Sequence, residues 1–118
     1  MEERKNLRRG DVFLADLSGA GGVLKKKRPV LVVQNDLRNR HAADTIILAI
    51  RDPHGGRLLP VHVPVGKGTG GLQKDSEIDA GHVMTVPKTV LAQRIGSLPL
   101  PILEQVDRSL LISLGLAS

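Results

Sequence analysis

The chain has 118 residues, of which 17 are Lys or Arg and 12 are Asp or Glu, so its formal net charge at pH 7 is +5. This length fits a single domain, 1–118, and the basic excess favours a polyanionic partner, with nucleic acid ahead of an acidic protein or a membrane surface. The absence of cysteine excludes disulfides and thiolate catalysis, and one Phe without Tyr or Trp leaves no set of aromatic rings on which bases could stack.

The first half of the chain contains three predicted strands, which are rich in apolar and β-branched residues: 11–16, 29–34 and 44–51. A Gly-rich loop at 18–22 precedes the second of them, and Asn35-Asp36 is predicted to form the turn after it. No signal peptide and no apolar run of membrane-spanning length is found, so we expect a soluble cytoplasmic protein.

The second half contains shorter elements. Residues 58–65 are predicted to form a strand, and Pro60 and Pro64 favour an edge position for it. Further short strands are expected within three segments and a single helical turn within a fourth: 75–80, 82–86 and 94–98 for the strands, and 87–91 for the turn.

Only the end of the chain has the periodicity of a helix. Pro101 suits a first helical turn, Gly115 suits a C-terminal cap, and the apolar positions between them recur at helical spacing: Ile102, Leu103, Val106, Leu110 and Leu114. Short strands with Gly and Pro at the corners and one terminal helix predict a mainly β fold, a small, partly closed β-barrel with a C-terminal helix.

Four consecutive cations, Lys25, Lys26, Lys27 and Arg28, lead directly into the second strand. Pro29 fixes its own φ and biases Arg28 toward extended backbone, so the last cation is held beside a rigid element. A guanidinium keeps its charge and offers a planar set of donors to a phosphate, which makes Arg28 the first candidate for phosphate recognition. A merely solvated basic face is the alternative.

Other patterns predict no cofactor and no metal site. The loop 66–71 is rich in glycine but lacks the Gly-Lys-Ser/Thr ending of a nucleotide-binding loop. The four histidines, His41, His54, His62 and His82, show no close metal-ligand spacing. His62 alternates with two valines, and we expect it at the surface.

Six segments in this order resemble the MazF/PemK family of toxin endoribonucleases: RGDV at 9–12, KRPVLVVQND at 27–36, LPVHV at 59–63, KDS at 74–76, IGSL at 95–98 and SLGL at 113–116. The resemblance extends from about Arg9 to Leu116. Arg-Pro followed by an apolar strand and Gln-Asn-Asp is its most specific element.

The resemblance implies an SH3-like barrel that forms a homodimer and cleaves single-stranded RNA at specific sequences without metal. In such enzymes the ribose 2′-OH attacks the adjacent phosphorus, leaving a 2′,3′-cyclic phosphate and a 5′-OH. It also implies a cognate antitoxin whose acidic, partly disordered segment occupies the RNA surface. Arg28 falls on the family's catalytic arginine, and we assign RNA contacts to Lys25, Lys26, Lys27, Gln34 and Asn35.

The chain departs from the family at three places. Arg51 stands where the family has Thr or Ser, His82 stands where it has Gln, and the first loop, GAGGVL at 19–24, lacks the family's Glu-Gln pair. Our hypothesis is that Arg51 forms a second phosphate clamp and that His82 is the general base or acid. A rim cation and a half-buried structural histidine are the alternatives.

The same departures leave two other functions open. One is a relative that binds RNA, or another partner, without cutting it. The other is a toxin that acts on a protein target such as DNA gyrase, because a related fold is used by gyrase poisons.

Overall fold

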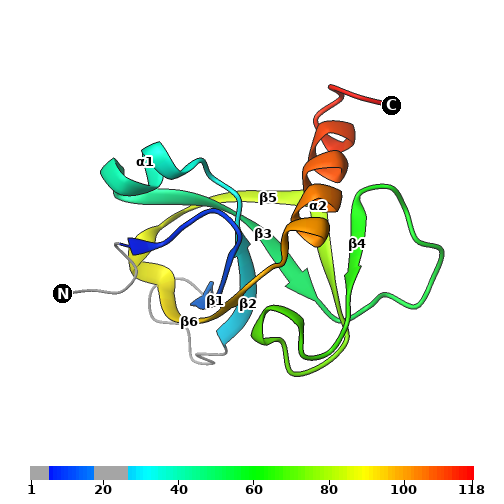
Figure 1. Ribbon diagram of the computed structural model, residues 1–118, viewed down its shortest axis with the longest axis horizontal. Helices are drawn as coiled ribbons and strands as arrows, with labels where there is room; N and C mark the ends of the chain where they lie inside the picture. Colours follow the sequence, from blue (N-terminus) through cyan, green and yellow to red (C-terminus); the bar gives the residue numbers. More distant parts are fainter. Residues whose placement is uncertain (1–5, 18–26) are drawn as a thin grey trace.

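The computed structural model, shown in Figure 1, describes residues 6–17 and 27–118. Its six strands form one sheet in the order β4-β5-β3-β2-β1-β6, with every neighbouring pair antiparallel. The strands are β1 Asp11–Asp16, β2 Lys27–Val32, β3 Asp44–Arg51, β4 His62–Val65, β5 Ser76–Pro87 and β6 Leu91–Ser97. Two α-helices, α1 Asp36–His41 and α2 Leu100–Ser113, and two 3₁₀ turns, η2 Thr69–Gly71 and η3 Lys88–Val90, complete the described elements.

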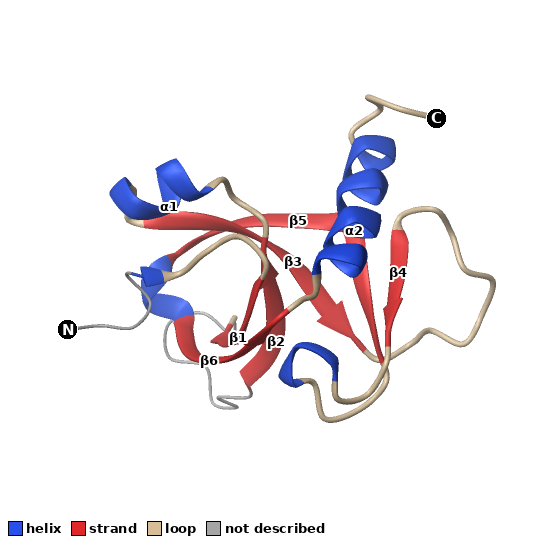
Figure 2. Ribbon diagram, in the orientation of Figure 1, coloured by secondary structure: helices blue, strands red, loops and turns tan. Residues whose placement is uncertain are grey.

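This arrangement confirms the mainly β fold with a C-terminal helix. The sheet curves strongly, as Figure 2 shows, but β4 and β6 remain its two edges and do not pair with each other among the described strands. The predicted barrel is therefore open. No helix among the described residues is long and apolar enough to cross a membrane.

Side chains on the two faces of the sheet build two separate apolar clusters, because successive residues of a strand point to opposite faces. Leu31 and Leu48 belong to the cluster that α2 covers with its buried residue Val106. Val30 and Ile47 belong to the cluster on the other face. The helix is also fixed by a hydrogen bond of 2.7 Å that Ser109 Oγ donates to the Pro60 carbonyl.

Several predicted elements are confirmed. The first and third strands have the predicted bounds, 11–16 and 44–51, and the proline-containing strand β4 is indeed an edge. The helix α2 begins at Leu100, and Gly115 follows its end with a φ of +75°, as expected of a C-terminal cap. Leu114, the last of the apolar positions at helical spacing, follows the final residue of α2 and is 62% exposed.

Other predictions were wrong in detail. The second strand, predicted at 29–34, is Lys27–Val32, and the strand predicted at 58–65 begins only at His62. Asn35-Asp36 is not a simple turn, because the Asn35 side chain accepts a hydrogen bond from the Arg38 backbone N–H and so caps the helix α1. The predicted strands 75–80 and 82–86 are one continuous strand, β5. Its register against β3 jumps from Asp79 opposite Ala49 to Val83 opposite Leu48, which accommodates Gly81 in a bulge.

Candidate active site

Arg28 is the second residue of β2, where it pairs with Ala15 of β1 and is exposed, as is its neighbour Lys27. Within the described residues, its guanidinium has neither a hydrogen bond nor an ion pair. It is therefore a charge available to an anionic ligand. Lys25 and Lys26, the other cations of the predicted run, lie outside the described residues.

Arg51 lies on the same face of the sheet as Arg28. Val30 of β2 is directly opposite Ala49 of β3, so these two residues share a face. Arg28 precedes Val30 by two residues and Arg51 follows Ala49 by two, which in antiparallel strands places both arginines on that face at the same end. The structure thus brings two of the predicted catalytic residues onto adjacent strands.

Arg51, in contrast to Arg28, is fully engaged by carboxylates of β5. Its Nη2 donates to Glu77 Oε2 at 3.0 Å, and its Nη1 lies 3.0 Å from Asp79 Oδ2. Its Nε is 3.3 Å from Glu77 Oε2. The register explains these contacts, because Glu77 is paired with Arg51 and Asp79 with Ala49. Arg51 is thus an exposed cation at the end of β3, as the rim-cation alternative states, and two carboxylates hold it there.

A buried carboxylate, Glu77, is the centre of this arrangement, with a side chain only 3% exposed. Burial raises its pKa, but hydrogen bonds from His54 and Arg51 outweigh burial and leave the pKa of Glu77 below its ordinary value. His54 Nδ1 is 2.8 Å from Glu77 Oε1, and His54 Nε2 is 2.9 Å from the Arg57 carbonyl. Because both ring nitrogens face acceptors, chiefly Glu77, the pKa of His54 is raised.

His62 completes the cluster and corrects a prediction. Alternation places it on the face opposite the neighbouring valines as expected, but its side chain is only 9% exposed and is not a surface group. Its Nε2 accepts a hydrogen bond of 3.1 Å from Arg51 Nη2, whereas its buried Nδ1 has no hydrogen-bond partner in the described part of the chain. The His54 and His62 rings lie 5.0 Å apart.

His82 lies in the bulge of β5 and is exposed. A half-buried structural histidine is therefore excluded. No hydrogen bond or ion pair joins it to Arg28 or Arg51 in the described part of the chain, so the structure does not assemble the three predicted catalytic residues into one contact network.

Gln34 is buried, with 2% of its surface exposed, and its side chain serves the fold. Its Nε2 donates to Asn39 Oδ1 at 2.9 Å and to the Asp44 carbonyl at 3.1 Å, and its Oε1 accepts from Arg38 Nε at 3.1 Å. This burial argues against the predicted RNA contact, and we leave Gln34 out of the site. Asn35 is exposed, and its Oδ1 caps α1.

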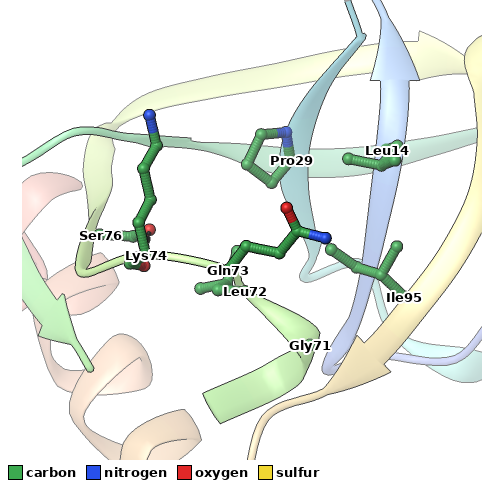
Figure 3. Close-up of a pocket in the computed structure, with 8 residues that line it drawn as sticks. All are labelled: Leu14, Pro29, Gly71, Leu72, Gln73, Lys74, Ser76 and Ile95. Atoms are coloured by element: carbon green, nitrogen blue, oxygen red, sulfur yellow. Dashed lines mark hydrogen bonds between the residues drawn. The ribbon is translucent and has the colours of Figure 1, made fainter. Parts of the chain in front are cut away.

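A pocket of 450 Å³ lies between the strands β1, β2 and β6 and the segment that leads into β5. Figure 3 shows Gln73 reaching toward Pro29 and Ile95, with Lys74 extending away from it. Because Pro29 and Arg28 are adjacent in β2, they face opposite sides of the strand, so the pocket is separate from the arginine pair.

The sequence analysis did not identify the two carboxylates that form ion pairs with Arg51. Glu77 and Asp79 alternate with Ser76, Ile78 and Ala80, and this alternation alone placed both acids on one strand face. It did not show which strand would lie beside them. His54 was missed because the loop that holds it is linked to Glu77 only through tertiary structure.

A curved antiparallel sheet, with a C-terminal helix on one face and two arginines at one end of the other, defines a small, mainly β protein with a candidate anion-binding surface. Residues 8–114 match the family described as the PemK-like, MazF-like toxin of type II toxin-antitoxin systems, and the chain belongs to this family.

Curated relatives and solved structures agree with the assignment. The chain is 39% identical over 115 residues to endoribonuclease MazF of Staphylococcus epidermidis, covering 93% of this chain and 92% of the relative. It is 38% identical over 115 residues to endoribonuclease EndoA of Bacillus subtilis, covering 93% and 96%. A mycobacterial endoribonuclease in complex with its cognate antitoxin matches with a TM-score of 0.78 and 28% identity, covering 95% of this chain and 98% of that one.

Proposed function

We propose that this protein is the toxin of a type II toxin–antitoxin system and a sequence-specific endoribonuclease that cleaves single-stranded mRNA without metal. The observation that carries the proposal is Arg28, which has no ion-pair partner among the described residues and is held at the start of a strand on the same face as Arg51. Relatives that match nearly the whole chain are named endoribonucleases, which supports the same activity.

In the proposed reaction the ribose 2′-OH loses its proton and attacks the adjacent phosphorus, and the bond to the 5′-oxygen breaks. The products are a 2′,3′-cyclic phosphate and a 5′-OH, which takes up a proton. Arg28 binds the scissile phosphate and stabilises the extra negative charge of the pentacoordinate transition state. This role requires a cation that is not already neutralised by a carboxylate, and Arg28 meets that requirement.

Arg51 and His82 have proposed secondary roles. Arg51 adds a phosphate clamp by exchanging its contact with Glu77 or Asp79 for one with the phosphate. His82 is exposed and its imidazole can both accept and donate a proton, which suits proton transfer to or from the ribose and the leaving oxygen. Lys25, Lys26, Lys27 and Asn35 bind the RNA backbone or bases in this proposal.

The proposed partners are single-stranded RNA, a second copy of the chain and an acidic antitoxin segment, all in the cytoplasm. Apolar residues at the end of the chain support an interface there, because four of them are exposed: Leu100, Leu111, Leu114 and Leu116. The mycobacterial relative that was solved with its cognate antitoxin supports a partner of that kind.

The test is cleavage of a long, mixed-sequence RNA in excess EDTA by wild-type protein and by Arg28→Ala. Discrete cuts with 2′,3′-cyclic phosphate and 5′-OH ends are expected from the wild type, and the variant should be slower by about 10²–10³. Arg108→Ala is the matched control, because it removes an exposed cation from α2, on the other side of the sheet. Equal rates for all three proteins would refute the role of Arg28.

The proton-transfer role of His82 has its own test. His82→Gln should lower the rate and change the pH–rate profile, since an amide can serve neither as general base nor as general acid. An unchanged rate and profile would exclude His82 from the chemistry while leaving Arg28 untouched.

A second function, RNA binding without cutting, is favoured by the neutralisation of Arg51 by Glu77 and Asp79. It predicts salt-dependent RNA association and no discrete cuts by a folded wild-type protein. The cleavage assay above therefore distinguishes the two functions directly.

A further inference from the structure

We propose that His54, His62 and Glu77 form a binding site for a single Zn²⁺ ion. The three residues come from different elements: the loop after β3, the strand β4 and the strand β5. One ligand atom from each lies within 4.8 Å of the other two. Two imidazoles and a carboxylate are a donor set that Zn²⁺ uses when a fourth position is left to water or another ligand.

The unpaired Nδ1 of His62 is the observation that points to a cation. The atom is buried, has no hydrogen-bond partner among the described residues, and lies 3.8 Å from Glu77 Oε2, too far for a hydrogen bond. A buried polar atom without a partner is destabilising, and an ion between this nitrogen and the Glu77 carboxylate would give the nitrogen a partner.

The surroundings of both histidines suit metal binding. His54 Nε2 donates to the Arg57 carbonyl, so a metal that displaces the proton between Nδ1 and Glu77 would find the Nδ1 lone pair available. When His62 binds metal through Nδ1, its ring proton moves to Nε2, which then can no longer accept the hydrogen bond from Arg51 Nη2, so metal binding requires this contact to break. A backbone carbonyl is a usual outer partner of a metal-bound histidine, and the Arg57 carbonyl fills this place for His54.

Arg51 competes with the proposed ion for the Glu77 carboxylate, and its other contacts show how it could leave Glu77. Its Nη2 shares Glu77 Oε2 with the proposed ion, but its Nη1 is independently held by Asp79 Oδ2 at 3.0 Å. Arg51 can therefore release Glu77 and keep a partner. Ligand nitrogens around a tetrahedral Zn²⁺ are separated by about 3.3 Å, so small side-chain rotations bring the three donors to that spacing.

The site is independent of the proposed RNA cleavage, which is metal-free, and its test measures binding alone. Untagged protein, freed of metal with EDTA and dialysed, is titrated with Zn²⁺ by calorimetry, and Co²⁺ serves as a spectroscopic probe of tetrahedral geometry. We expect one Zn²⁺ per chain. His54→Ala and His62→Ala should each weaken binding by about tenfold or more.

The matched controls are His41→Ala and His82→Ala, which remove exposed histidines outside the cluster and should bind Zn²⁺ like the wild type. His54 lies in an exposed loop, so its variant is expected to fold even if a variant of the buried Glu77 does not. Absence of saturable binding to folded wild-type protein would overturn the proposal. Zn²⁺ binding that survives in His54→Ala and His62→Ala but is lost in His41→Ala or His82→Ala would assign the metal to surface histidines. That result would also overturn the proposal.

Discussion

Gln34 was predicted to bind RNA, whereas its buried contacts indicate that it stabilises the fold. The substitution Gln34→Ala distinguishes these two roles. The substitution removes three hydrogen bonds: those to Asn39 and to the Asp44 carbonyl, and the one accepted from Arg38. Asn39 Oδ1 keeps the Thr45 hydroxyl at 2.8 Å, and Arg38 is exposed enough to find water. The lasting loss is therefore the donor to the Asp44 carbonyl and the packing of a buried side chain.

These losses correspond to a decrease of about 2 kcal/mol in the free energy of unfolding. The unfolding entropy of a chain of 118 residues is about 0.25 kcal/mol/K near the transition. The melting temperature should therefore fall by about 8 °C. Cleavage per folded molecule, measured well below the transition, should equal that of the wild type.

The isosteric variant Gln34→Glu keeps the shape but replaces the Nε2 donor with a buried acceptor, so it should be at least as destabilised. Gln93→Ala, at an exposed position of β6, is the control and should leave the melting temperature unchanged. A Gln34→Ala protein that melts within about 2 °C of the wild type but no longer cleaves RNA would refute this reasoning and restore the RNA contact.

Two further predictions concern other parts of the fold. Gly71→Ala should destabilise the protein strongly, because the new Cβ would overlap the Ile95 carbonyl oxygen and φ at this position is +79°. A thermal unfolding measurement checks this. Gly66→Ala is the control, because a Cβ at that position would meet nothing within 4 Å. In EDTA, NMR titration should give His54 a pKa above 6.5 that returns toward 6.5 in Glu77→Gln. Because the folded pKa is raised, the stabilisation from charged His54 is present below pH 6.5 and is lost as the pH rises through the folded pKa. A His54 pKa that does not respond to Glu77→Gln would contradict the ion pair.

The regular elements were predictable where a strand or helix has a clear repeat. The strand 44–51 and the terminal helix carry enough apolar residues at fixed spacing to identify their period and length. The helix α1 was not predictable in this way, because its six residues, DLRNRH, include one large apolar residue and therefore no periodicity. Its only signal was the capping residue Asn35, which also suits a turn.

Side-chain environments were less predictable than elements. Alternation gave the correct face for His62, but burial depends on which groups lie beside that face. These are the ring of His54, from the loop just before β4, and Glu77 of β5, and alternation places neither of them. Gln34 follows an apolar run and precedes a polar pair, which is typical of an exposed strand end. The structure buries it because Asn39 and Thr45 offer matching partners from α1 and β3.

Arg28 and Arg51 differ in their ion-pair partners, which the sequence could not predict either, and this difference bears directly on function. In the sequence both are cations at strand ends, and both contribute equally to the net charge. In the fold, Arg51 lies between two carboxylates of the adjacent strand, whereas Arg28 has no such partner among the described residues. A phosphate can bind Arg28 by displacing water alone, but it can bind Arg51 only by displacing Glu77 or Asp79. Arg28 should therefore make the first and stronger phosphate contact, and any contribution of Arg51 should depend on how readily Glu77 releases it.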